Sequence, residues 1–526
     1  MHRGRLRNRR PQVVSAPTRT VVANGTVVDG FGGVPWVGDV LISGGRIEAL
    51  VPGGSRPESG YDAAVVDATG HVVSPGFVDI HCHSDLTRFA YPVNESRITQ
   101  GITTEVVGNC GMSAAPTGND ARTFASLIAT IDVTPETPRP WSTVSEWLDA
   151  LDRTPSTTNV AALVGHGSAR HTAAGQTTGD PTIQATARVV REALDTGCVG
   201  ASLGLMYAPG ESAPPEELRA IGEEVASAGA LFAAHLRDYR AAAIRGSVAE
   251  VVEASGGARI QISHLRATSP EPGFADILEH VESLRDRFDI AADCYPYIAG
   301  HTTLVQILPS SVRAGGPSEV LKMGSNPSLL AALLEASGWR PDQIIIMKAA
   351  RSAEAVGDSP VNHSAPWAWL ADLLLSNDGL VDVAVESGFW RDVDSALRKD
   401  WVTIGSDGTA LSPDHQISAP HPRSWGAFPA AFRRMRDNGI GLATAVRRMS
   451  VASAERVRVP SGLRPGAPAD IAVFDELTFD SDASFGHPAR PATGLLHVFV
   501  NGRQVVANGR PTSERPGRLR RAGETT

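Results

Sequence analysis

The sequence predicts an α/β fold, a (β/α)8 TIM-like barrel accompanied by a small β-domain built from both ends of the chain. Through the centre, eight apolar strand-like runs alternate with helix-like amphipathic segments. Nearly all of these runs end in, or lead directly into, a polar or ionisable residue, which is where such a barrel carries its functional groups. At both ends of the chain the pattern changes to short β-branched runs broken by glycine.

The two ends share this second pattern. Residues 19–73 contain β-branched runs separated by glycine-rich turns, as expected for strands joined by hairpins. Residues 461–509 return to the same pattern after the long central segment. We therefore expect the two stretches to join in one β-domain beside the barrel.

The central segment, residues 74–460, supplies the barrel. Its runs are, in order, GFVDI, TTEVVGNC, NVAALVGHG, VGASLGLMY, ALFAAHLRD, RIQISHLRA, DIAADCYPY and WVTIGSDG. About a hundred residues separate the last two runs, and a connection of that length is usually a lid or a subdomain. We expect a lid-like insertion at about residues 299–390.

Composition excludes several classes of protein. The 526 residues are 42% apolar, enough for a large buried core, and the net charge is -9. This charge provides no general basic surface for nucleic acid, and no window approaches the roughly 18 apolar residues of a membrane span. We expect a cytoplasmic protein with no nucleic-acid or membrane partner. Residues 1–18 and 510–526 are rich in Arg and Pro and are predicted to be basic, solvated tails.

The run GFVDI leads into His81, Cys82 and His83. Residues two apart on a strand project to the same side, so the two imidazoles face one way and Cys82 faces the other. Paired imidazoles suit zinc, although a structural pair with satisfied hydrogen bonds is equally compatible with this motif.

Cys110 ends the second run between two glycines, Gly108 and Gly111, which allow an irregular turn to present the thiol. A buried cysteine is ordinarily a small apolar residue, but this one follows the end of a strand and favours a thiolate ligand. Cys198 and Cys294 lie inside runs and are predicted to be core residues.

His235 and His264 occupy matching places on consecutive runs, AAHLRD and ISHLRA. Together with Cys110 they offer two imidazole nitrogens and one sulfur. Three protein ligands with an open fourth position are typical of catalytic zinc. Each histidine alone could instead be a core residue bonded to the backbone.

Asp407 closes the last run, in GSDG. Beside an activated water, a carboxylate can accept a proton and pass it to a leaving nitrogen. A turn or helix-capping aspartate is the structural alternative.

Basic and phenolic side chains that suit a substrate carboxylate also lie close to these strand ends. They are Arg266, Tyr295, Tyr297 and Arg423. Surface arginines are common, and His166 and His421 are weaker candidates for further contacts.

The specific motifs are PGFVDIHCHSD, QGITTEVVGNCGMSAAP, NVAALVGHG, AHLRD, ISHLRA, YPYIAG, GSDG, HPRSWGAFP and PGAPADIAVFD. With them the chain resembles the N-acyl-D-amino-acid deacylases (D-aminoacylases) of the amidohydrolase superfamily, from about residue 19 to residue 509. The resemblance implies a metal-dependent barrel with a small β-sandwich. It also implies hydrolysis of a small-molecule N-acyl-D-amino acid to a carboxylate and a free D-amino acid.

The resemblance implies a role for each candidate. Cys110, His235 and His264 match a tight zinc site, and His81 and His83 match a second, weaker one. Asp407 matches the general base and acid. Arg423, with Tyr297 or Tyr295, matches the groups that hold the α-carboxylate, and the insertion matches a lid.

Four departures put the preferred substrate in doubt. Arg266 stands where a lysine is usual, and His301 stands where a small hydroxyl residue is common. The segment around His363 does not follow the family pattern, and more residues than usual separate Asp407 from Arg423.

Two alternatives stay open. A cyclic-amide hydrolase of the hydantoinase or dihydroorotase kind usually needs a carboxylated lysine on the fourth strand, and VGASLGLMY has none; lysine-free amidases of formamides or carbamoyl groups are not excluded. A catalytically inactive structural relative would be expected to have lost ligands.

Overall fold

The central barrel is formed by eight parallel strands, and each coincides with one of the predicted runs. The structure, a computed structural model, describes residues 19–53, 63–128, 139–176, 182–268, 273–309, 312, 320–349, 351–414 and 420–524. The barrel strands are β6 (Phe77–Asp79), β7 (Ile102–Val107), β8 (Asn159–Gly165), β9 (Gly200–Gly204), β10 (Leu231–His235), β11 (Arg259–Ile262), β12 (Ile290–Cys294) and β16 (Val402–Ile404). Their order is β16-β12-β11-β10-β9-β8-β7-β6.

The barrel closes just beyond the carboxyl ends of its first and last strands. Cys82 and Gly408 form a parallel bridge, and the backbone N–H of Asp407 donates to the carbonyl of His81 at 2.7 Å. Residues that follow β6 and β16 are therefore held side by side, where the candidate ligands lie.

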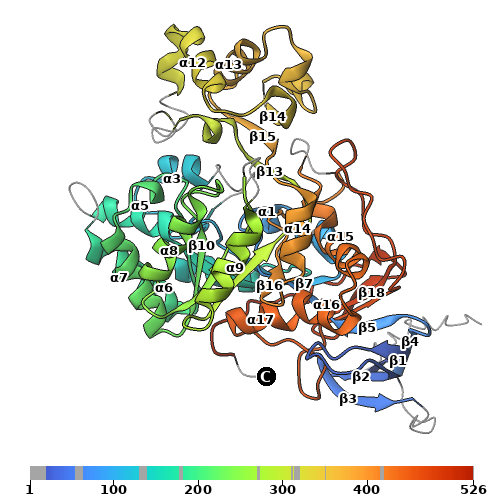
Figure 1. Ribbon diagram of the computed structural model, residues 1–526. Helices are drawn as coiled ribbons and strands as arrows, with labels where there is room; N and C mark the ends of the chain where they lie inside the picture. Colours follow the sequence, from blue (N-terminus) through green and yellow to red (C-terminus); the bar gives the residue numbers. More distant parts are fainter. Residues whose placement is uncertain are drawn as a thin grey trace, which may run out of the picture.

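Helices surround this barrel (Figure 1). They are α1 (Thr87–Ala90), α2 (Glu95–Ile98), α3 (Ala121–Ile128), α4 (Val144–Arg153), α5 (His166–Gln176), α6 (Ile183–Thr196), α7 (Pro215–Ser227), α8 (Ile244–Ala254), α9 (Phe274–Leu284), α14 (Trp390–Leu397), α15 (Arg423–Asp437), α16 (Leu442–Met449) and α17 (Val451–Val457). Helix α6 shows ordinary capping chemistry at both ends: Thr182 accepts from the N–H of Ala185, and Gly197 ends the helix in the left-handed region. No helix in the described ranges is long and apolar enough to cross a membrane.

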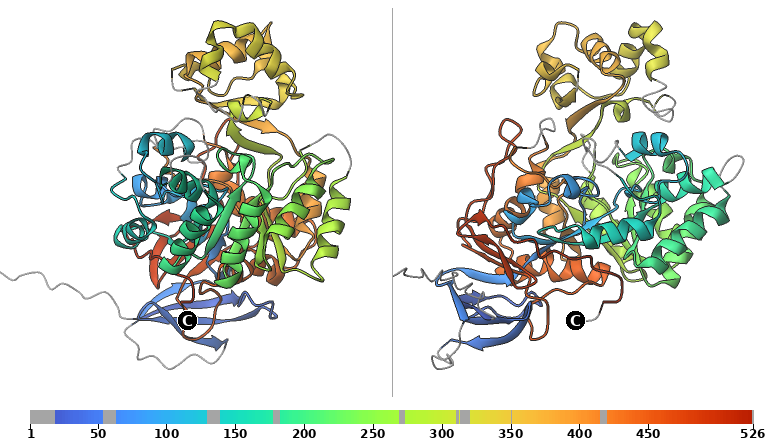
Figure 2. Two further views of the ribbon diagram at one scale, coloured as in Figure 1. Left: turned by 90° about the vertical axis from the view of Figure 1, so that its left-hand side faces the viewer. Right: turned by 180° about the vertical axis from the view of Figure 1, so that it is seen from behind.

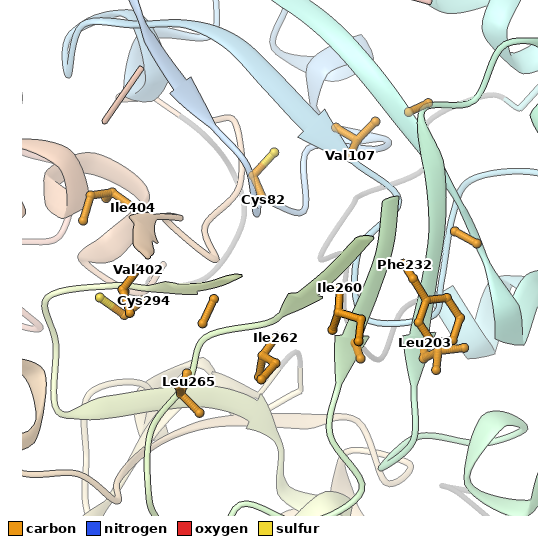
Figure 3. Close-up of a cluster of buried hydrophobic side chains, with 14 of the residues drawn as sticks. Cys82, Val107, Leu203, Phe232, Ile260, Ile262, Leu265, Cys294, Val402 and Ile404 are labelled. Atoms are coloured by element: carbon orange, nitrogen blue, oxygen red, sulfur yellow. The ribbon is translucent and has the colours of Figure 1, made fainter. Parts of the chain in front are cut away.

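Side chains on the outward face of the strands form an apolar layer with these helices. Figure 3 shows Cys82 and Cys294 in this layer with Phe232 and Ile260. Cys198 belongs to the same cluster, so three of the four cysteines are core residues. Strand alternation turns the neighbours of Cys82, His81 and His83, into the barrel.

Both ends of the chain contribute to one nine-stranded sheet. Its strands are β1 (Arg19–Val27), β2 (Trp36–Ser43), β3 (Arg46–Pro52), β4 (Ala63–Asp67), β5 (Val72–Pro75), β17 (Ile471–Phe474), β18 (Leu495–Val500), β19 (Arg503–Ala507) and β20 (Arg510–Pro511). Strand β5 joins the halves because it pairs with β1 on one edge and with β17 on the other. The predicted fold class, a barrel with a β-domain from both ends, is confirmed.

The insertion between β12 and β16 is a compact subdomain that projects from one end of the barrel (Figures 1 and 2). It contains a three-stranded antiparallel sheet of β13 (Ala299–Thr303), β15 (Val381–Glu386) and β14 (Ile344–Ala349), with α12 (Pro327–Glu335) and α13 (Pro366–Ser376). Leu330, Leu370 and Val383 belong to its own buried cluster.

The end of the chain differs from expectation. Residues 510–524 were predicted to be a solvated tail, but they run against the barrel. Leu519 is buried and bridges Val160 of β8, and Arg520 pairs with Asp470 at 3.3 Å. An isolated apolar residue between arginines gave no periodic signal for this packing. The tail predicted for residues 1–18 lies outside the described residues.

Candidate metal centre and active site

Three predicted ligands meet where β7, β10 and β11 end. Sγ of Cys110 lies 3.4 Å from Nδ1 of His235 and 3.6 Å from Nε2 of His264, and these two nitrogens are 3.0 Å apart. Zinc bonds of about 2.3 Å to sulfur and 2.0 Å to nitrogen place tetrahedral ligands roughly 3.5 and 3.3 Å apart. Because the observed separations are close to these values and all three groups are buried, the donor set fits zinc.

His81 and His83 complete the cluster from the end of β6. Nε2 of His81 is 3.4 Å from Sγ of Cys110, and Nε2 of His83 is 3.0 Å from Oδ1 of Asp407. Ligand atoms of His81, Cys110, His264 and Asp407 all lie within 4.8 Å of one another. The structure thus brings all five predicted metal ligands and the predicted acid-base residue together.

Three of these residues have unusual backbone conformations. Cys110, His264 and Asp407 have φ values of 51°, 34° and 50°, in the left-handed region that side chains other than glycine rarely adopt. Strain of this kind persists where the surrounding structure fixes it, and it is concentrated at functional sites. The turn at Cys110 requires a glycine at position 111, because a Cβ on Gly111 would lie 2.3 Å from the backbone N of Gly204.

Asp293, inside β12, is a site residue that the sequence did not reveal. Its Oδ1 lies 3.2 Å from Nδ1 of His81 and accepts the backbone N–H of His264 at 2.8 Å. Its Oδ2 accepts from Gln261. A carboxylate behind a ligating histidine fixes the ring orientation and the nitrogen left for the metal. Nothing in AADCYPY distinguishes this aspartate from an ordinary strand residue.

The charges favour an ionised thiol. Burial alone would raise the pKa of Cys110, but His81 and His235 outweigh it and hold that pKa well below the usual thiol value. Thiolate is the form that binds metal.

Asp407 is held between the metal cluster and an arginine. Its Oδ1 faces His83 and His81, at 3.0 and 3.5 Å, and its Oδ2 accepts from Nη1 of Arg423 at 2.6 Å. Burial opposes ionisation, but Arg423 and the His83 hydrogen bond keep the pKa of Asp407 well below its usual range. Asp407 is therefore in the ionised form that a general base requires.

Arg266, Tyr295 and Arg423 form one group beside Asp407. Arg266 donates to the hydroxyl of Tyr295. The guanidinium carbons of Arg266 and Arg423 lie 5.4 and 5.1 Å from the centre of the Tyr295 ring, so the phenol separates the two cations. The insertion starts beside this group, since a Cβ at position 300 would lie 2.3 Å from Nη2 of Arg266.

Tyr297 does not join this group. Its backbone N–H donates to the carbonyl of Tyr295 at 2.9 Å, a tight turn around Pro296 that ends the strand alternation. Its hydroxyl is buried without a hydrogen-bond partner, although the side chain lines a small pocket together with Arg266, Tyr295 and Phe389. Of the two tyrosines predicted to contact substrate, Tyr295 is the one that contacts Arg266 and Arg423.

His166 and His421 have structural partners. His166 lies 2.7 Å from Glu217, deep in the fold. His421 lies 3.1 Å from the carbonyl of Ala299 and accepts the N–H of Arg423, so it connects the start of the insertion to the start of α15.

A cavity of about 490 Å³ opens onto the cluster. The barrel side is lined by His83, Cys110, Met206, Tyr207, His235, Tyr239, His264, Arg266, Asp407 and Arg423. The insertion supplies the opposite wall, including His301, Gln306, Trp339 and Asp382.

Comparison with known proteins gives three close relationships. The model of the amidohydrolase family matches residues 64–255. An N-acyl-D-aspartate deacylase of Alcaligenes xylosoxydans xylosoxydans is 31% identical over 517 residues, which are 96% of this chain and 95% of that protein. A D-aminoacylase of the same organism is 30% identical, over 96% of this chain and 98% of that protein.

This chain belongs to the N-acyl-D-amino-acid deacylase family of amidohydrolases. The crystal structure of an N-acyl-D-glutamate deacylase from Bordetella bronchiseptica, complexed with zinc and a phosphonate mimic of the tetrahedral intermediate, superposes with a TM-score of 0.81. It is 29% identical and covers 96% of this chain and 100% of that one. The resemblance stated from the motifs is confirmed, and the chain is a hydrolase of the deacylase family.

Within this deacylase, β9 carries no lysine. Two of the three lysines of the protein lie elsewhere. Lys348 is on β14 of the insertion, and Lys399 lies beside Glu282. The sulfur of Cys110 instead lies between His81 and the pair formed by His235 and His264.

Proposed function

We propose that this protein hydrolyses the amide bond of N-acyl-D-amino acids, releasing a carboxylate and a free D-amino acid. The observation that carries the proposal is the placement of Asp407. One of its oxygens faces the histidine and cysteine cluster, and the other is paired with Arg423 beside Arg266 and Tyr295. Asp407, the two arginines and the metal-ligand candidates His83, Cys110, His235 and His264 line one cavity, which supports this proposal.

We assign Cys110, His235 and His264 to a tight zinc site, and His81 and His83 to a second, weaker position. Zinc held there supplies Lewis acidity toward the amide carbonyl and toward water. The separations within the first set and the ionised thiol support this assignment.

Asp407 acts as the general base and then as the general acid. It accepts a proton from the attacking water as the new C–O bond forms, and it returns that proton to the nitrogen as the C–N bond breaks. Its ion pair with Arg423 fixes the carboxylate oxygen that is turned away from the metal ligands.

Arg266, Tyr295 and Arg423 hold the α-carboxylate. With this group fixed and the amide carbonyl directed at the metal ligands, only one enantiomer places its hydrogen and side chain in the spaces available. The insertion covers the cavity as a lid, since it supplies one wall directly opposite the barrel.

A cyclic-amide hydrolase is disfavoured. Its usual carboxylated lysine has no counterpart on β9, and Cys110 occupies the space between the two sets of histidines.

The experiment is amine release by the zinc-loaded protein from paired N-acetyl-D- and N-acetyl-L-amino acids with Met, Leu, Phe, Gln and Glu side chains. We expect release from members of the D series and from no member of the L series. Zinc-loaded protein that releases nothing from either series would overturn the proposal.

A further inference from the structure

The arginines that line the cavity can neutralise the charge of one substrate carboxylate. Within the described ranges, the arginines that line it are Arg237, Arg240, Arg266 and Arg423. Three of them have carboxylate partners: Arg237 pairs with Glu250, Arg240 with Asp238 and Arg423 with Asp407. Arg266 donates to a phenol, and no ion pair joins it to a carboxylate of the described chain. One guanidinium is therefore unneutralised, and the α-carboxylate of the substrate would neutralise it.

The insertion places a carboxylate on the opposite wall. Asp382 lies on β15, its residue is 6% exposed, and it lines the cavity. The sheet register sets Asp382 opposite Thr303 of β13 and Lys348 of β14. It forms a long ion pair with Nζ of the half-buried Lys348, at 3.9 Å, which is too long for a hydrogen bond. Burial raises the pKa of Asp382 to about 6, so the carboxylate is largely ionised at pH 8.

A second acceptor lies on the same wall. Oε1 of Gln306 is buried without a hydrogen-bond partner, and Gln306 lines the cavity. The wall formed by Asp382 and Gln306, the acceptor wall, favours groups that donate hydrogen bonds or carry no charge. A carboxylate placed against it would lose its hydration and would face a like charge without a compensating guanidinium.

We infer that Asp382 is a specificity-determining residue, and that the substrates are N-acyl-D-amino acids in which the α-carboxylate is the only anionic group. Side chains such as those of D-glutamine and D-methionine are accepted, and those of D-aspartate and D-glutamate are rejected. This inference rests on the proposed deacylase function. Sequence identity alone does not give it, because the relatives named for D-aspartate and for D-aminoacylase activity are 31% and 30% identical to this chain.

The test compares N-acetyl-D-glutamine with N-acetyl-D-glutamate, which match in shape and differ in charge. With the full-length zinc-loaded protein at pH 8, we expect kcat/KM to be at least ~100-fold higher for the glutamine substrate, since an uncompensated like charge costs several kcal/mol. Equal values, or a preference for the glutamate substrate, would overturn the inference. Calorimetric binding of both compounds to an Asp407→Asn variant should give the same order of affinity without turnover.

Two variants test whether the charge of Asp382 causes the preference for the glutamine substrate. Asp382→Asn keeps the shape and removes the charge, and it should reduce the glutamine-to-glutamate ratio by about tenfold, as expected for the loss of roughly 1.4 kcal/mol of discrimination. Lys348→Met removes the neighbouring cation and should increase the ratio, which gives a control of opposite sign. An unchanged ratio in Asp382→Asn would refute the role of Asp382 even if the wild-type preference is as stated.

Failure of the inference differs from failure of the proposed function. Release from N-acetyl-D-methionine and from both members of the pair at equal rates overturns the inference and leaves the deacylase assignment in place. No release from any D substrate overturns both.

Discussion

Oδ1 of Asp293 lies 3.2 Å from Nδ1 of His81, on the edge of the imidazole that faces away from Cys110. The same oxygen accepts the backbone N–H of His264, whose φ of 34° needs external support. One buried carboxylate therefore orients two candidate metal ligands from different strands, although it is not a ligand itself.

Replacing Asp293 by Asn should weaken zinc binding by roughly 10- to 100-fold, the usual effect of removing an outer carboxylate from a ligating histidine. The amide retains an oxygen for the His264 N–H, so the fold should survive, as circular dichroism can verify. Competition with a chelator measures the affinity. Wild-type affinity in this variant would show that Asp293 only supports the backbone.

Cys110→Ser should lose most of its zinc, because a hydroxyl is a much weaker ligand than a thiolate. Cys198→Ser is the matched control, since Cys198 is equally buried but lies in the apolar layer outside the barrel. Metal analysis after gel filtration separates the two. Zinc loss in both variants, or in neither, would contradict the assignment of Cys110.

Asp407→Asn should reduce kcat by at least about 10³-fold, within the range for loss of a general base, while zinc remains bound. Activity with N-acetyl-D-methionine and zinc content are measured on the same sample. Retained activity would remove Asp407 from its catalytic role.

The two arginines should give different kinetics. Arg266→Ala should mainly raise KM, because Arg266 donates to the Tyr295 hydroxyl and forms no ion pair with Asp407 or any other carboxylate of the described residues. Arg423→Ala should raise KM and also alter the pH profile. Arg423 helps to hold the pKa of Asp407 below its usual range against the effect of burial. Without Arg423 that pKa rises, and the acidic limb of the kcat profile moves to higher pH. An acidic limb at the same pH in the Arg423→Ala variant would contradict the effect of Arg423 on the pKa of Asp407.

Arg520→Met should destabilise the fold by about 3 kcal/mol, since it leaves Asp470 buried with one partner fewer. Arg518→Met is the control, because Arg518 is exposed two residues away and makes its hydrogen bonds through the backbone. Urea unfolding compares them. Equal free energies of unfolding would indicate that residues 510–524 lie on the barrel without stabilising it.

The regular part of the fold could be predicted because the barrel repeats one local pattern. Each run is apolar and ends where the chain becomes polar, so His235 and His264 could be placed side by side from their equal positions on consecutive strands. Cys110 could be assigned because Gly108 and Gly111 mark an irregular turn.

Other features depend on contacts that leave no local pattern. Strand alternation predicts that Tyr295 and Tyr297 face the same way, but the turn at Pro296 separates them. Asp293 looks like any strand residue until the fold brings His81, which follows β6, and His264, which follows β11, next to β12. The packing of Leu519 on Val160 joins residues 359 positions apart, which no window along the chain can reveal.

The insertion is connected to the barrel through the paired strands β13 and β15. It has its own small buried core above the cavity. Selection can therefore alter residues on its inner wall, such as His301 and Asp382, without moving any histidine or cysteine of the barrel. Enzymes of this kind can acquire new substrates by substitutions in the insertion while the metal ligands and catalytic residues of the barrel stay the same. This separation of substrate recognition from catalysis would produce relatives that are named for different D-amino acids and are nearly equally identical to this chain.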